Sequence, residues 1–490
     1  MQLLMMLYLL AVCSIIPLYM KQGYYGLGEA KGICYLALSL CFFALFFTCF
    51  LISRRKTYSV KLGTGPVSVM QLCLFATILS GAVSFIFSVD KKTAFWGIEG
   101  WRCGFLSLFL MVFFGLILSN ISTLPVWGIC LMLLVPGLEF SLGIMNRFGI
   151  YTVFSGAANS GYLATIGNIN WYAGFLSVFL PLGIGIMYAQ RPFSKLFFIN
   201  GIYVILGVAA LFLQGSDGAL LIIISSYILL LLYSLFSSDF ELVRKWLIQL
   251  FVLGAGMSFA QVMLTLFGEM YTYEDNLLVG ILNMNTGIII MAAAFFLYNL
   301  VKLLDEIKVS FKGRLLGKAA AFAVIMLILT GIYIAAGNFG DEFGNGRGLI
   351  WRMCTDVFLG FSPWEKMVGV GQDCLYPYAM KSPSMSEVFT GAFGGDMLTN
   401  AHCELLTVLI ERGFIGACTY LGLFISTLYD VLWAKERENA AIACALPIFS
   451  YFVYSQISFS QVTATPYVYI LIGIYLAFSR KNLGQLRDRN

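Results

Sequence analysis

The sequence has little charge and almost no histidine. Only 11% of its 490 residues are Asp, Glu, Lys or Arg, and its single histidine is His402. So little charge excludes an ordinary soluble globular domain. The net charge of +5 fits attraction to anionic lipid and predicts no nucleic-acid partner. Because histidine is the side chain that normally titrates near neutrality, proton-transfer chemistry at pH 7 points first to His402.

Motifs for metals, cofactors and nucleotides are also missing. The chain has no internal repeat, no GxxxxGK phosphate loop, no CxxC pair and no HExxH zinc motif, so we expect neither a metal nor a cofactor. Cys354, Cys374 and Cys403 fall in one polar loop. They could oxidise outside the cytoplasm, but their spacing selects no pair.

Long apolar segments are what the chain has in abundance. It is 60% hydrophobic, and its mean hydropathy is +0.87. Each segment approaches the roughly 20 residues that a helix needs to cross ~30 Å of hydrocarbon. Each segment is apolar throughout and does not alternate between apolar and polar residues, which predicts helices and not a barrel. We expect an all-α polytopic membrane protein of about 12–14 transmembrane helices, at 3–20, 33–52, 67–89, 103–119, 121–143, 168–189, 196–213, 218–236, 246–267, 277–300, 319–336, 414–433, 440–458 and 466–479.

The distribution of Lys and Arg predicts the orientation of the chain. With both ends cytoplasmic, most basic residues, including Arg54 and Lys308, fall in cytoplasmic loops, as the positive-inside rule requires. The sequence then divides into transmembrane helices at 1–336, one large extracytoplasmic loop at 337–413, and C-terminal helices with a short cytoplasmic tail at 414–490. The expected location is the cytoplasmic membrane, with multi-pass topology.

Two amphipathic helices are expected in the polar loop. Gly344-Asn345-Gly346 is typical of a turn, and the apolar spacing that follows predicts a helix over 347–360, with Arg347 in its first turn. A second helix is expected from near Asn400 to Gly413, with His402 at its N-terminal end. Neither helix is long enough to span, so both are expected at the outer membrane surface.

These residue types suit a reaction in which a hydroxyl attacks a carbon whose leaving group is a lipid diphosphate. The planar fork of an arginine such as Arg347 or Arg352 binds phosphate through paired, charge-assisted hydrogen bonds, and a neutral imidazole can act as general base. A diphosphate leaves without protonation, so no acid is needed, and the sequence shows no obvious carboxylate pair. Glu404 either orients the His402 ring or favours a helix N-terminus. On composition alone, an arginine or histidine in a loop is more often a surface or packing residue.

Five short stretches occur in a fixed order along the chain. They are GNINW at 167–171, GRGLIWR at 346–352, GVG at 369–371, NAHCELL at 400–406 and ERGFIG at 411–416. Their order and spacing on a polytopic background resemble the O-antigen ligase and O-antigen polymerase superfamily. The resemblance covers roughly residues 150–480.

The resemblance implies a membrane-embedded glycosyltransferase of the GT-C type that needs no metal. Such enzymes transfer a glycan from an undecaprenyl diphosphate carrier to an acceptor hydroxyl on a glycan, lipid or protein. Carried over by position, His402 would be the base that activates the acceptor, and Arg347 would bind the diphosphate. Asn168 and Asn170 would contact the substrate.

The chain departs from the family pattern at two positions. Ser216-Asp217-Gly218 stands where the family often has SRG, whose arginine contacts the diphosphate. An acid cannot do this directly, so either Arg352 or Arg147 substitutes, or the donor is held differently. Asp217 can equally be a solvated turn residue or a helix cap. Cys403 stands where the family usually has Asn.

The sequence leaves two alternatives to a ligase. A polymerase of lipid-linked repeat units would use the same donor chemistry, and no motif separates the two. A transporter or flippase for a lipid-linked solute is the alternative of another class. Transporters tend to show repeated halves and broken helices, whereas here the polar residues are concentrated in one loop, which favours an enzyme.

Overall fold

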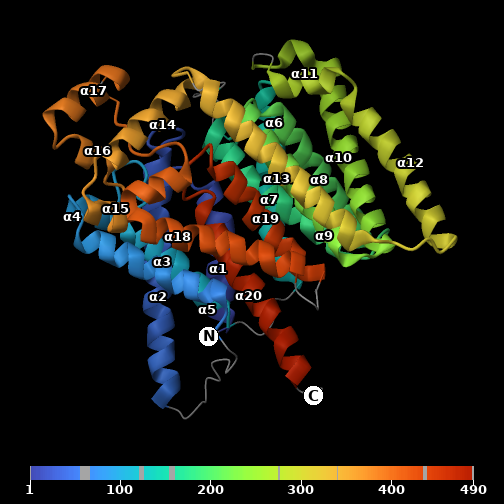
Figure 1. Cartoon of the computed structure of the whole chain (residues 1–490), viewed down its shortest axis with the longest axis horizontal. Coiled ribbons are helices and arrows are strands. Elements are labelled where there is room, and N and C mark those ends of the chain that lie inside the picture. Colours follow the sequence, from blue (N-terminus) through green and yellow to red (C-terminus); the bar gives the residue numbers. More distant parts are fainter. Residues whose placement is uncertain are drawn as a thin grey trace. The chain divides into compact units, whose positions relative to one another are not determined.

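The chain is almost entirely helical. The computed structural model describes residues 2–55, 67–120, 126–153, 161–273, 276–338, 340–394, 396–433 and 439–487, and in them it forms twenty α-helices (Figure 1). One antiparallel hairpin joins the two-residue strands β1 (Tyr162–Leu163) and β2 (Gly167–Asn168). The expected all-α class is confirmed.

Many of these helices can cross a membrane. Eight in the described part of the chain are long and apolar enough, and they belong to α2 (Leu27–Arg55), α3 (Val69–Ile86), α7 (Ile169–Ala189), α8 (Lys195–Leu213), α9 (Leu220–Ser237), α10 (Phe240–Phe267), α12 (Thr286–Glu306) and α18 (Glu404–Trp433). Shorter apolar helices are α1 (Gln2–Leu18), α5 (Phe105–Leu118), α19 (Asn439–Ser455) and α20 (Thr465–Arg487). These apolar helices identify a multi-pass membrane protein.

Two further predicted spans coincide with helices. The predicted spans 121–143 and 319–336 overlap α6 (Val126–Arg147) and α13 (Gly313–Asn338). Residues 121–125 of the first prediction lie outside the described residues.

The prediction of a single span over 277–300 is wrong. The segment forms the short helix α11 (Leu277–Asn283), and α12 then begins at Thr286 and continues to Glu306. Asn285 separates the two helices with a left-handed backbone, φ 57°, a conformation that asparagine tolerates better than most residues. Mean hydropathy stays high across this break, because the polar residues Asn283, Asn285 and Thr286 lie between long apolar segments.

The helices form two compact units. Unit 1 comprises Met1–Gly128, Phe339–Thr427 and Ser455–Asn490, and unit 2 comprises Ile129–Asn338 and Leu428–Tyr454. The loop expected at 337–413 thus belongs with helices from both ends of the chain. Hydrogen bonds explain why: Ser84 Oγ donates to the carbonyl of Glu411, and the Val89 N–H donates to the carbonyl of Val370 at 3.0 Å.

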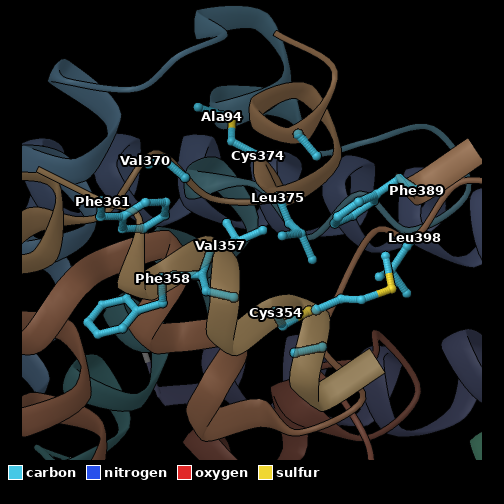
Figure 2. Packing of buried hydrophobic residues seen from close by; sticks show 14 residues of the cluster. Ala94, Cys354, Val357, Phe358, Phe361, Val370, Cys374, Leu375, Phe389 and Leu398 are labelled. Carbon is cyan, nitrogen blue, oxygen red and sulfur yellow. The ribbon is translucent and has the colours of Figure 1, made fainter. Parts of the chain in front are cut away.

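The polar loop is a folded structure with its own apolar core. Figure 1 shows the short helices α15 (Pro363–Val368), α16 (Leu375–Ala379) and α17 (Pro383–Phe393) beside α14 (Phe343–Leu359) and α4 (Lys91–Trp96). Figure 2 shows the buried side chains between them, which include Ala94, Cys354, Val357, Phe358, Phe361, Val370, Leu375 and Phe389. This core fixes where α14 and the start of α18 lie within unit 1.

Both helices expected in the loop are present. Gly344, Asn345 and Gly346 have positive φ, so regular helix in α14 starts at Arg347 and ends at Leu359, close to the predicted 347–360. The second helix starts at Glu404 and not at Asn400, and it breaks at Gly413, whose φ is 66°. The apolar part of α18 follows this break.

The turn at 369–371 forms hydrogen bonds with the helix just before the break at Gly413. Because the helix stops there, the carbonyls of Ile410 and Glu411 accept instead from the N–H groups of Val370 and Gly371, both at 3.1 Å. A Cβ on Gly369 would lie 2.1 Å from the Glu411 oxygen, and one on Gly413 would lie 2.3 Å from the Met367 carbonyl. Two of the sequence stretches quoted above therefore pack directly on each other.

This packing predicts that alanine at either glycine destabilises unit 1. Gly369 and Gly413 have φ of 79° and 66°, so a Cβ adds backbone strain on the order of 1–3 kcal/mol to the steric clash. We expect a lower melting temperature for Gly369→Ala and Gly413→Ala in detergent. The control is Gly391→Ala in α17, where an added Cβ meets nothing within 4 Å. Melting of Gly413→Ala at the temperature of this control would contradict the assignment.

Candidate functional site

His402 lies in a tightly held turn directly before α18. Its φ is 48°, a left-handed conformation that costs energy in a non-glycine residue and is often found at functional sites. The His402 N–H donates to Asn400 Oδ1 at 3.1 Å, and the Ala401 N–H donates to Thr407 Oγ1 at 3.1 Å. Thr407 Oγ1 in turn donates to the Cys403 carbonyl at 3.0 Å. The backbone around the imidazole is thus fixed from both sides.

The imidazole itself keeps its nitrogen atoms free of protein hydrogen bonds within the described residues. The His402 ring packs edge-on against the Phe459 ring, with centroids 5.1 Å apart. Burial, reinforced by the positive charge of Arg347, lowers the pKa of His402 from 6.5 to about 4. At pH 7 the ring is therefore neutral and can accept a proton.

Arg347 brings a positive charge to the same part of unit 1. It opens the regular part of α14, and its Nη1 donates to the Gly344 carbonyl at 2.8 Å. Its Nε is buried without a hydrogen-bond partner in the described residues, and no described carboxylate forms an ion pair with it. A guanidinium in this state retains donors for an anionic ligand.

Arg352, on the same helix, is in a different state. Its Nη2 donates to Asp341 Oδ2 at 2.8 Å, and the two side chains are 59% and 49% exposed. An exposed ion pair of this kind contributes roughly 0–1 kcal/mol. Of the two arginines predicted on this helix, Arg352 already has an anionic partner, whereas Arg347 has none in the part of the chain that the structure describes.

Glu404 holds a neighbouring backbone segment. It is buried at the first position of α18, and its Oε2 accepts from the Ser460 N–H at 2.6 Å. The charge of Arg412 acts on it, whereas its described contacts do not include the His402 ring. Glu404 does occupy the first turn of the helix, one of the two roles considered from the sequence.

Sequence reasoning missed a buried carboxylate pair formed by Asp373 and Glu411. The Asp373 N–H donates to Glu411 Oε1 at 2.9 Å, and Asp373 Oδ2 accepts from the N–H groups of Ile98 and Cys103 at 3.0 and 3.1 Å. Burial raises the pKa of Asp373, although these two donors oppose the shift. The pair was not obvious from the sequence, because Asp373 and Glu411 are 38 positions apart.

Arg412 belongs to this buried group. It is only 3% exposed, and its Nε and Nη1 have no hydrogen-bond partner in the described part of the chain. Its charge acts on Glu404 and Glu411. The sequence could have indicated part of this group. Glu404 and Glu411 are two helical turns apart and therefore share one face of α18.

Three of the remaining predicted residues lie together in unit 2. Asn168 caps α7, its side chain accepting from the Asn170 N–H at 2.8 Å. Asn170 Oδ1 accepts from Ser216 Oγ at 3.1 Å. Asp217 follows Ser216, is exposed and opens a short 3₁₀ turn before α9. The structure therefore gives Asn168 a capping role and places Asp217 in an exposed turn.

Arg147 lies beside this segment. It is 1% exposed, its Nη2 donates to the Gln214 carbonyl, and its guanidinium covers the Tyr273 ring at 4.3 Å. Gln214 Nε2 donates to the Ser216 carbonyl at 2.7 Å. Arg147 thus borders the stretch that departs from the family pattern, whereas Arg347, Arg352, His402 and Glu404 belong to unit 1.

The loop cysteines are free thiols, and they form no disulfide with any described cysteine. Burial raises the pKa of Cys354 to about 12, and burial raises the pKa of Cys403 as well. Cys403 Sγ lies 3.9 Å from Gln456 Oε1. Among the described residues, no group of three or more His, Cys, Asp or Glu could hold a metal ion.

No protein-family model matches this chain, and no curated protein matches its sequence. The resemblance therefore depends on the short stretches alone. In unit 1 these stretches are in contact: the GVG turn packs on ERG, and the charge of Arg347 reaches the NAHCELL turn.

The site predicts that His402 titrates far below its ordinary pKa. As the only histidine, it gives one signal in protein labelled with ¹³C-histidine, so its pKa can be followed by NMR. We expect a midpoint of about 4. Arg347→Gln should raise this midpoint, because the imidazolium is no longer repelled, while burial keeps it below 6.5. Arg352→Gln, the matched control, should leave it unchanged. A wild-type midpoint near 6.5 would refute the buried, neutral ring.

Proposed function

We propose that the protein transfers a glycan from an undecaprenyl diphosphate carrier to an acceptor hydroxyl at the outer face of the cytoplasmic membrane. The observation that carries this proposal is a neutral imidazole without a hydrogen bond to any described residue. The charge of Arg347 acts on it, and no described carboxylate forms an ion pair with that arginine. Both groups lie in a folded loop of a multi-pass membrane protein. The resemblance to O-antigen ligases and polymerases supports the same chemistry.

The two side chains divide the reaction between them. Arg347 binds the diphosphate of the donor, whose charge it complements. A His402 nitrogen accepts the proton of the acceptor hydroxyl while its oxygen forms a bond to the anomeric carbon. The bond between that carbon and the phosphate oxygen breaks, and the prenyl diphosphate leaves with the electron pair. The proton on His402 then passes to water.

Donor binding also strengthens the base. At a pKa of about 4 the imidazole is deprotonated at pH 7 but is a weak acceptor, because a general base works best with a pKa near the working pH. The negative charge of the diphosphate offsets the charge of Arg347 and raises the pKa of His402. The imidazole becomes a better base only when the donor is bound.

The substrate contacts that the resemblance implies for residues of unit 2 stay predictions. Asn168 and Asn170 lie in the stretch that resembles the family's GNpN segment, and Asn170 is bonded to Ser216. Arg147 is the arginine that holds the 214–217 segment. The resemblance leaves Arg147 or Arg352 as the residue that would replace the arginine absent at Asp217.

Removing either principal side chain should abolish transfer. His402→Ala removes the general base, which is worth roughly 10²–10⁴-fold in rate, and Arg347→Ala removes the diphosphate contact. Both variants should still insert in the membrane, and transfer is measured with lipid-linked donor in proteoliposomes. Arg352→Ala is the matched control on the same helix, and its smaller effect on donor KM measures any secondary contact. Near-normal turnover in His402→Ala would end the proposal.

The fate of the glycan in cells distinguishes the alternatives. Deleting the gene should leave finished chains on the prenyl carrier if the protein is a ligase. A polymerase of repeat units is indicated if single units accumulate. A transporter or flippase is indicated if the lipid-linked glycan stays on the cytoplasmic leaflet. The measurement is the lipid-linked glycan pool compared with the mature surface polymer.

A further inference from the structure

Phe459 contacts two other rings, those of His402 and Trp101. Phe459 lies in the segment before α20 and is 7% exposed. Its ring meets the His402 ring with centroids 5.1 Å apart and the Trp101 ring with centroids 4.8 Å apart. Both contacts are edge-to-face, an arrangement that aromatic rings favour. The imidazole thus rests on an aromatic pair from two distant parts of unit 1, Trp101 and Phe459.

Each loop that carries one of these rings is held by a buried carboxylate. Glu404 accepts from the N–H of Ser460, the residue after Phe459, at 2.6 Å. Asp373 accepts from the N–H groups of Ile98 and Cys103, which flank Trp101 in the chain, at 3.0 and 3.1 Å.

The two loops are also joined to each other. Cys103 Sγ donates to the Ser460 carbonyl at 3.6 Å. Four hydrogen bonds therefore fix the backbone on both sides of Trp101 and directly after Phe459.

Burying carboxylates in this way is expensive, because an ionised group loses its hydration. Asp373 and Glu404 are 6% and 8% exposed, and neither forms an ion pair in the described residues. The hydrogen bonds of both carboxylates fix the two loops that carry the aromatic pair. The imidazole nitrogens have no hydrogen-bond partner among the described residues, so the packing against Phe459 is the described contact that bears on the orientation of the ring.

We propose that Glu404 and Asp373 are positioning residues, which hold Phe459, backed by Trp101, against His402 and so set the orientation of its imidazole. The inference rests on the proposed role of His402 as the base. A correctly oriented base matters because proton transfer requires a hydrogen bond of about 2.6–3.2 Å to the hydroxyl.

Phe459→Leu tests the ring contact. Leucine keeps an apolar side chain in the segment but removes the aromatic edge, so the His402 ring gains freedom and contact with water. We expect the ¹³C signal of His402 to shift, its pKa to rise, and kcat to fall on the order of tenfold with little change in donor KM. The matched control is Phe389→Leu, a residue 4% exposed in the loop core that does not contact His402. Unchanged His402 signals in Phe459→Leu would overturn the inference.

Glu404 offers a conservative rescue. Glu404→Gln retains an oxygen that can accept from the Ser460 N–H, so the His402 signal and kcat should stay near wild type. Glu404→Ala removes the acceptor and should reproduce the effect of Phe459→Leu. If the glutamine and alanine variants shift the His402 signal equally, the hydrogen bond to Ser460 does not position the ring.

Different results overturn the positioning role and the proposed function. Loss of transfer in His402→Ala with unchanged His402 signals in Phe459→Leu overturns the positioning role and leaves the proposed function standing. Normal transfer in His402→Ala overturns the proposed function, whatever the NMR signals show.

Discussion

The hydrogen bonds between the 369–373 turn and the first part of α18 are the interaction on which the site depends. They use carbonyls that the break at Gly413 leaves without helical partners, and they bring Asp373 to Glu411. The turn that carries His402 and the loop that carries Trp101 both attach to this junction. A membrane-spanning helix with a break at the start of its apolar part thus supports a site that is made largely of loops.

Two arginines of unit 1 have different surroundings. Arg347 forms no ion pair with a described carboxylate, and its charge acts on the neutral imidazole of His402. Arg412 is buried with Asp373, Glu404 and Glu411, whose carboxylates accept from backbone N–H groups. The buried carboxylates thus fix backbone geometry, whereas Arg347 keeps donors that an anionic ligand can use.

Turns, helix breaks and apolar helices were predicted from residues that are close together in the sequence. The glycine-rich turn before Arg347 and the helix break at Gly413 follow from glycine's tolerance of positive φ, and hydropathy located most apolar helices. The division at Asn285 was not predicted, because mean hydropathy over a long window stays high when a few polar residues lie between two apolar segments. The contact between Asp373 and Glu411 and the placement of Phe459 against His402 depend on tertiary packing, which spacing along the chain does not encode.

The most direct test of the account is whether a diphosphate bound at Arg347 changes the protonation of His402. Farnesyl diphosphate can be titrated into detergent-solubilised protein carrying ¹³C-histidine, with the pKa of the single histidine measured at each concentration. The account predicts a saturable rise of that pKa above about 4, which disappears in Arg347→Ala. A His402 pKa that does not respond to the diphosphate, or responds equally without Arg347, would contradict it.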